Sequence, residues 1–250
     1  MRRAGVVAAL LAAGCITSRP KMSSSELYLT ERMATVLLSE GNAAEAENAF
    51  REALKQDPDN PEMLNGLGLS LLMMSRAREA VPEFDKAIKI APGKGSYLNN
   101  RGAARLETGD TAGAEDDFLK AYESPNSGDK ESALINLGRS RYRRGRFEES
   151  EESLTRAIAL NPTFDALTAR GVTREARQNE EGAVSDFLAA LRLKPENPSA
   201  LLRVGLGLVV MQKTDLGHRY LRRICELAPD SVEATRARVL LGEETTFRPH

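Results

Sequence analysis

The chain repeats itself at an interval of 34 residues, and this period restricts its fold more than any other feature. Phenylalanine occurs at Phe50, Phe84 and Phe118, with alanine four places before each of them. With small shifts of spacing, glycine forms a second column at Gly68, Gly102, Gly138, Gly171 and Gly205. A period of this length indicates an array of stacked units, each too small to bury its own apolar face.

These columns resemble the tetratricopeptide repeat, a helical hairpin of 34 residues. That family has small residues at the eighth, twentieth and twenty-seventh places, an aromatic residue at the twenty-fourth and proline at the thirty-second. Six copies begin near Leu27, Pro61, Gly95, Glu131, Phe164 and Pro198. The resemblance implies an all-α fold, an α-solenoid superhelix of six helical hairpins over residues 26–230.

Elementary packing gives the same result. Small residues let two helices approach to the short end of the usual 8–10 Å interaxial range, and the aromatic side chain fills the space below them. Gly41, Gly109 and Gly145 lie between the helices of their hairpins, where a turn needs positive φ.

The last hairpin of such an array needs a cap. Residues 231–242 are predicted to form a capping helix that begins after Ser231 and ends at Gly242. Its expected buried residues include Val232, Ala234, Val239 and Leu240. Residues 243–250 are read as a C-terminal tail.

Residues 1–14 have the pattern of an export signal. Two arginines precede eleven small or apolar residues, Ala4 to Gly14. This run is shorter than the roughly 20 residues that cross a bilayer, so a signal peptide is predicted rather than a spanning helix.

The end of this signal, Leu11-Ala12-Ala13-Gly14-Cys15, resembles the lipobox of bacterial lipoproteins. Those proteins are cut before the cysteine, whose thiol is acylated. The resemblance implies a lipid anchor on Cys15, and Ile16, where an aspartate commonly retains such proteins at the inner membrane, points to the outer membrane. Residues 15–25 are expected to be a flexible tether. The alternative is an ordinary secretory signal whose cysteine has no role.

Composition narrows the function classes. The net charge of −1 gives no basic excess for nucleic acid. The two histidines, His218 and His250, belong to no metal-spaced cluster, and no residue cluster meets the needs of a catalytic site. We expect no enzyme activity, cofactor, metal or small-molecule substrate.

In the tetratricopeptide family, four places of each first helix face a concave groove. In the first three repeats they include Glu31, Thr35, Leu38, Asn65, Leu69, Leu72, Asn99, Ala103 and Leu106. The resemblance implies that these residues form a partner-binding groove, with a row of leucines flanked by amides. The alternative is that the leucines pack against adjacent hairpins.

The eleventh place holds leucine in the outer repeats but Arg105, Arg141 and Arg174 in the inner three. The twenty-third place holds Asp117 and Asp186 in two of these repeats. One hypothesis is intra-repeat ion pairs, Arg105 with Asp117 and Arg174 with Asp186. The other is a ladder for an acidic ligand. Arg141 is expected to turn to Glu149 or Glu152.

A lipobox followed by six such repeats resembles the pilotin lipoproteins of type IV pilus systems. The segments "LNNRG" at 98–102 and "NLG" at 136–138, with a lengthened connection between them, strengthen the likeness. It implies a lipid-anchored protein on the periplasmic face of the outer membrane. Such a protein binds secretin subunits and promotes their assembly in pilus biogenesis and motility. A scaffold for barrel assembly or peptidoglycan synthesis is the alternative.

Overall fold

The computed structural model describes residues 23–125 and 128–243, and within these residues it contains thirteen α-helices and no strands. The predicted signal peptide, Cys15, all but the end of the tether and residues 244–250 lie outside the described part of the chain. The prediction of an all-α superhelix of six hairpins with a capping helix is confirmed.

Each hairpin consists of two antiparallel helices of similar length. The first helices are α2 (Ser24–Ser39), α4 (Pro61–Met73), α6 (Gly95–Thr108), α8 (Lys130–Arg143), α10 (Phe164–Ala176) and α12 (Pro198–Val210). The second helices are α3 (Ala43–Leu54), α5 (Ala77–Ile90), α7 (Thr111–Glu123), α9 (Phe147–Leu160), α11 (Glu180–Leu193) and α13 (Thr214–Leu227). The capping helix is α14 (Val232–Leu241).

Four predicted repeat starts coincide with the first residue of a helix, at α4, α6, α10 and α12. The first repeat begins earlier than expected, because Ser23 and Glu26 form a capping box. The Glu26 N–H donates to Ser23 Oγ at 3.3 Å, and the Ser23 N–H donates to Glu26 Oε2 at 2.7 Å. Ser24 and Ser25, predicted to belong to the tether, are therefore the first residues of α2.

The repeated aromatic side chains form the centre of each hairpin. Phe84, Phe118 and Phe187 are fully buried. The glycine column lies directly above them: a Cβ atom on Gly102 would lie 2.6 Å from Phe118 Cε1. The fourth and sixth hairpins have leucine in place of the aromatic residue and keep the same arrangement.

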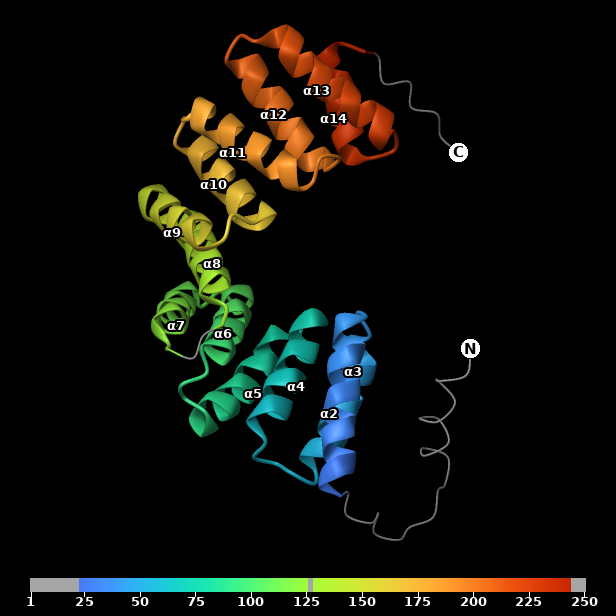
Figure 1. The fold of residues 1–250 in the computed structure, drawn as a ribbon, viewed down its shortest axis with the longest axis vertical. Helices are drawn as coiled ribbons and strands as arrows, with labels where there is room; N and C mark the ends of the chain where they lie inside the picture. The colour runs from blue at the N-terminus through green and yellow to red at the C-terminus, as the bar shows by residue number, and fades with distance from the viewer. Residues whose placement is uncertain (1–22, 126–127, 244–250) are drawn as a thin grey trace.

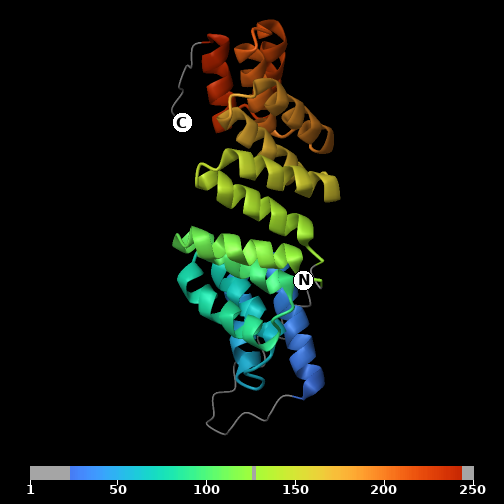
Figure 2. The same cartoon turned by 90° about the vertical axis from the view of Figure 1, so that its left-hand side faces the viewer.

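The hairpins stack into an arc, with α6 to α9 in its middle and the first and last hairpins toward one side (Figure 1). Seen from the side, the helix pairs form successive layers along the long axis (Figure 2). Helix α4 contacts both α2 and α6, and α8 contacts both α6 and α10. The first helices from α2 to α10 therefore touch one another directly, and the first helices line the inner side of the arc.

Helix α14 covers the last hairpin, but not with the residues expected. The Ala234 N–H donates to Ser231 Oγ at 3.0 Å, and Gly242 ends the helix at φ 73°, both as predicted. Ala234 and Ala237 are buried, whereas Val232, Val239 and Leu240 are exposed. The expectation for these three residues was wrong because α14 packs through its narrow alanine face, and Val232 and Val239 lie on the opposite one.

Candidate partner-binding groove

The predicted groove residues of the first three repeats all lie on α2, α4 and α6. Thr35 is exposed and the other eight are half-buried. Leu38 and Leu72 pack against the core around Phe50 and Phe84, and Leu106 packs against the core around Phe118. The leucine row thus supports the cores beneath it while part of each side chain faces outward.

The asparagines of the groove form a ladder between repeats. The Nδ2 group of Asn100 donates to Asn65 Oδ1 at 2.9 Å, and that of Asn136 donates to Asn99 Oδ1 at 3.0 Å. Two consecutive asparagines on α6 therefore tie this helix to both neighbours, α4 and α8. The Oδ1 acceptors of Asn65 and Asn99 are already used within the chain, which the sequence analysis did not anticipate.

The inner helices of repeats 1 and 2 carry two acids, Glu31 and Glu62, with the bases Arg32 and Lys94 beside them. Burial raises the pKa of Glu31, and the charge of Glu62 raises it further. Burial raises the pKa of Tyr97, which is only 4% exposed, and neighbouring Glu62 raises it further. Lys94 Nζ lies 3.8 Å from Glu62 Oε1.

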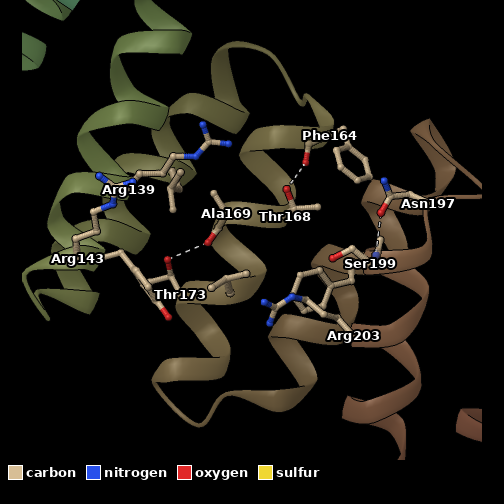
Figure 3. Close-up of a pocket in the computed structure, with 14 residues that line it drawn as sticks. Arg139, Arg143, Phe164, Thr168, Ala169, Thr173, Asn197, Ser199 and Arg203 are labelled. Atoms are coloured by element: carbon tan, nitrogen blue, oxygen red, sulfur yellow. Dashed lines mark hydrogen bonds between the residues drawn. The ribbon is translucent and has the colours of Figure 1, made fainter. Parts of the chain in front are cut away.

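The inner face at repeats 4–6 contains a pocket of about 450 Å³ that sequence reasoning missed. Helix α8 contributes Arg139, Tyr142 and Arg143 to its wall. Helix α10 contributes the floor, and α12 with the residue before it forms the opposite wall (Figure 3). These two sides comprise Phe164, Thr168, Ala169, Val172, Thr173, Asn197, Ser199, Ala200 and Arg203, and Leu154 and Phe187 lie beneath.

The pocket lies where the asparagine ladder stops. The places that hold asparagines in the preceding repeats hold Ile135 in repeat 4 and Ala169 in repeat 5. Neither side chain can form an amide pair between α8 and α10. The comparison of places five and six along all six repeats was the signal in the sequence that could have located this site.

Both predicted ion pairs are present in the structure, and each carboxylate binds a second arginine. Arg105 Nη1 lies 2.8 Å from Asp117 Oδ2, while Arg101 donates two hydrogen bonds to the same carboxylate, at 2.9 and 2.5 Å. Asp117 is fully buried. Two arginines on the inner helix α6, four residues apart, therefore bind the same buried carboxylate on the outer helix α7.

Repeat 5 has the same arrangement. Arg174 Nη1 lies 3.0 Å from Asp186 Oδ2, and Arg170 donates to both oxygens at 2.9 and 2.7 Å. Arg101 and Arg170 occupy the seventh place, which is apolar in repeats 2, 4 and 6. The seventh place is thus arginine in the two repeats whose twenty-third place is aspartate, a correlation that the sequence analysis overlooked.

Arg141 binds an acid of the preceding repeat. Its Nε lies 3.1 Å from Glu115 Oε1, and its Nη1 donates to Ser153 Oγ at 2.8 Å. Of the two expected partners, Glu149 forms an ion pair with Arg141, its Oε2 lying 3.7 Å from Arg141 Nε, whereas Glu152 forms none with it. The sequence prediction did not include Glu115, because Arg141 also extends across the repeat boundary toward α7.

The same boundary contact recurs one repeat later, where Arg174 Nε lies 2.8 Å from Glu151 Oε1. For Glu115 and Glu151, burial alone would raise the pKa, but the arginine hydrogen bonds outweigh burial and lower it. The three arginines of the eleventh place are thus engaged in contacts within and between repeats, which argues against the ligand ladder.

Residues 23–125 and 128–243 contain neither a metal-binding cluster nor a membrane-spanning helix. No group of three or more histidine, cysteine, aspartate or glutamate side chains could hold a metal ion there. None of the helices in these residues has the length and apolar character needed to cross a membrane.

Known proteins resemble this chain in its repeats and its overall shape. PilW, described as a widely conserved type IV pilus biogenesis factor, has a TM-score of 0.79 at 19% identity, covering 86% of this chain and 99% of PilW. PilF of Pseudomonas aeruginosa has a TM-score of 0.74 at 18% identity, covering 85% and 96%. YrrB, described as a repeat protein with an unusual peptide-binding site, reaches 0.59 at 18% identity over 76% and 98%. At these identities the likeness concerns the fold alone.

A curated relative shares one segment of the chain. Bacteriophage adsorption protein A of Escherichia coli (strain K12) is 38% identical over 72 residues, which are 29% of this chain. The chain spans only 7% of that relative's length.

The family pattern itself covers most of the chain. The tetratricopeptide repeat family matches residues 32–95, 74–129 and 135–198. Stacked repeats of this kind form extended concave surfaces that are typical of protein-interaction scaffolds. With its hairpins, its aromatic and glycine columns and its inner groove in agreement, the chain belongs to the tetratricopeptide repeat family.

Proposed function

We propose that this chain is a non-enzymatic lipoprotein on the periplasmic face of the outer membrane that binds secretin subunits and promotes their assembly in type IV pilus biogenesis. Acylated Cys15 anchors it, and the inner face of the repeats binds the partner. Holding the repeats and the secretin at one membrane raises their effective concentration for each other.

The observation that carries this proposal is the extent of the structural match. PilW and PilF are matched over 99% and 96% of their length, so the likeness covers the whole of those chains rather than a shared segment. PilW is described as a pilus biogenesis factor. The "LNNRG" segment, on which the pilotin resemblance partly rests, supplies two asparagines of the asparagine ladder in this chain.

The first experiment deletes the gene and measures the secretin of the same bacterium. The expected result is secretin that migrates as monomers, with the heat-resistant multimers restored by the wild-type gene on a plasmid. Normal multimers in the deletion strain would refute the proposed function.

The second experiment tests the anchor with a matched pair of variants at the two cysteines. Cys15→Ser should lose outer-membrane fractionation, while Cys225→Ser, a half-buried thiol on α13, should keep it. Unchanged fractionation of Cys15→Ser would refute lipid anchoring, and it would leave the multimer assay as a separate test of secretin binding.

A further inference from the structure

The pocket on the inner face of repeats 4–6 has the size and lining of a ligand site. Its volume of about 450 Å³ falls in the range of ligand pockets, about 300–1,000 Å³. Phe164, Ala169 and Val172 give it an apolar floor, and Phe187 and Leu154 close it from below. Such a space accommodates one large apolar side chain.

The charged part of the lining is cationic. Arg139, Arg143 and Arg203 line the pocket, and its lining contains no carboxylate. Arg139 and Arg143 come from α8 and Arg203 comes from α12, so the cations lie on opposite walls, as Figure 3 shows. Lys194 adds a further positive charge nearby, with its Nζ 4.6 Å from the centre of the Phe164 ring.

The hydrogen-bonding capacity of these arginines is largely unused. A guanidinium group has five N–H donors. Arg139 makes one contact of 3.4 Å with exposed Asp165, and Arg203 uses one nitrogen for Glu175. Arg143 is exposed and makes no ion pair or hydrogen bond with the described residues.

The structural arginines of the same chain behave differently. Arg101 and Arg170 use all three nitrogens, and each places two of them on a buried carboxylate. The inner face thus holds one set of arginines that stabilises the repeats and a second set whose donors remain available. Arginine forks of this kind match carboxylates in bidentate geometry.

The N-terminus of α12 favours the same ligand charge. Asn197 and Ser199 line the pocket, and Asn197 Oδ1 accepts the Ala200 N–H at 3.0 Å as the N-cap. The positive end of the helix dipole therefore lies beside the arginines, where it stabilises an anion.

We propose that this pocket binds an acidic peptide segment, with an aromatic or aliphatic side chain on the floor formed by Phe164, Ala169 and Val172 and an adjacent carboxylate held by Arg139, Arg143 and Arg203. The inference rests on the proposed function in taking the partner to be a protein. An extended peptide is favoured over nucleic acid, because the chain has no basic excess and only three arginines line the pocket.

The test uses the full chain, purified in a mild detergent, and fluorescein-labelled nonapeptides measured by fluorescence anisotropy. One peptide has a central phenylalanine with two glutamates on each side. A second has glutamines in place of the glutamates, and a third has serine in place of phenylalanine. The first peptide should bind at least about tenfold more tightly than either of the others.

Variants then assign the binding to the pocket. The triple substitution Arg139→Gln, Arg143→Gln and Arg203→Gln should abolish the preference for glutamate. Arg192→Gln is the control: this exposed arginine lies on α11 of repeat 5, between the repeats that carry the three arginines but outside the pocket lining, and the substitution should have no effect. Ala169→Leu, which fills the floor of the pocket, should weaken binding of the first peptide at least about tenfold. The variant should still prefer the glutamate peptide to the glutamine peptide. Circular dichroism verifies that each variant remains folded.

Equal binding of the glutamate and glutamine peptides, or binding unaffected by the triple substitution, would overturn the proposal. So would a pocket that binds anionic phospholipid vesicles or an oligonucleotide through the same arginines but not the peptide. The peptide assay tests the pocket, and the secretin multimer assay in cells tests the proposed function. If the protein prefers the glutamate peptide but its deletion leaves secretin multimers intact, the pocket proposal is upheld and the secretin assignment is refuted. If it shows no glutamate preference but its deletion abolishes the multimers, the secretin assignment is upheld and the pocket proposal is refuted.

Discussion

Asp117 provides the sharpest test of how this fold is held together. Its buried carboxylate accepts three hydrogen bonds, two from Arg101 and one from Arg105. Arg101 also binds Asp85, at 2.7 Å, but Asp85 is 49% exposed. The same guanidinium therefore joins one buried and one exposed acid, and replacing each acid by asparagine compares the two environments directly.

The two substitutions should lower the free energy of unfolding by amounts that differ several-fold. Asp117→Asn leaves two guanidinium groups, 15% and 23% exposed, facing a neutral amide. Removing one partner of a buried pair costs about 3–5 kcal/mol. Asp85→Asn removes an exposed pair, which contributes about 0–1 kcal/mol. A loss of about 3–5 kcal/mol would be a large share of the roughly 5–15 kcal/mol that stabilises a typical domain.

Urea unfolding monitored by far-UV circular dichroism measures the free energy of unfolding of both variants. Repeat arrays can unfold in steps, so the experiment should include Asp186→Asn, which removes the equivalent buried acid two hairpins later. Asp117→Asn and Asp186→Asn should lower the free energy of unfolding by similar amounts. If Asp117→Asn cost no more than Asp85→Asn, the assignment of these pairs as buried structural contacts would be wrong.

Three further substitutions test other parts of the fold by thermal unfolding. Gly102→Ala should destabilise by about 1–3 kcal/mol, because its new Cβ would lie 2.6 Å from fully buried Phe118; an unchanged Tm would contradict this. Glu31→Gln should raise the Tm at neutral pH. Burial raises the folded-state pKa of Glu31, so the ionised carboxylate destabilises the folded protein above that pKa. The gain in Tm from the glutamine variant should therefore vanish below the ordinary glutamate pKa of 4.5. Glu115→Gln should do the opposite. Its pKa is lowered because the Arg141 hydrogen bond and its neighbours outweigh burial, so the stability it provides is present above 4.5 and is lost as pH falls through the folded-state pKa. Identical pH trends for the two glutamine variants would refute both assignments.

The fold was predictable because each hairpin is determined by small and aromatic residues at fixed places. A glycine above a buried ring, as at Gly102 and Phe118, indicates from the sequence alone that two helices approach closely. The capping helix was less predictable in detail. Its alanines and its valines lie on two different faces, and only contact with α12 and α13 decides that Ala234 and Ala237 are the buried ones.

The ion pairs were predictable in part. Arg105 and Asp117 lie within one repeat, so a comparison of places eleven and twenty-three was enough to join them. Glu115 could not be found in this way, because its partners Arg141 and Arg144 belong to the next repeat. Contacts across a boundary depend on the superhelical rotation between hairpins, which the spacing within one repeat does not determine.

The pocket depends on several repeats at once, and this is why a reading of single repeats did not reveal it. It forms where Ile135 and Ala169 end the asparagine ladder, and its walls come from helices separated by a whole hairpin.

Arginine content alone could not identify this site either, since Arg101 and Arg139 are the same residue type on the inner helices of consecutive repeats. What separates them is the presence of a buried carboxylate. Arg101, at the seventh place, meets buried Asp117 at the twenty-third place of its own repeat, whereas Arg139, at the ninth place, meets only exposed Asp165 of the next repeat. A repeat protein can thus use one residue type to stabilise its stack and to bind a partner, and the place that an arginine occupies relative to a buried acid determines whether its donors remain available.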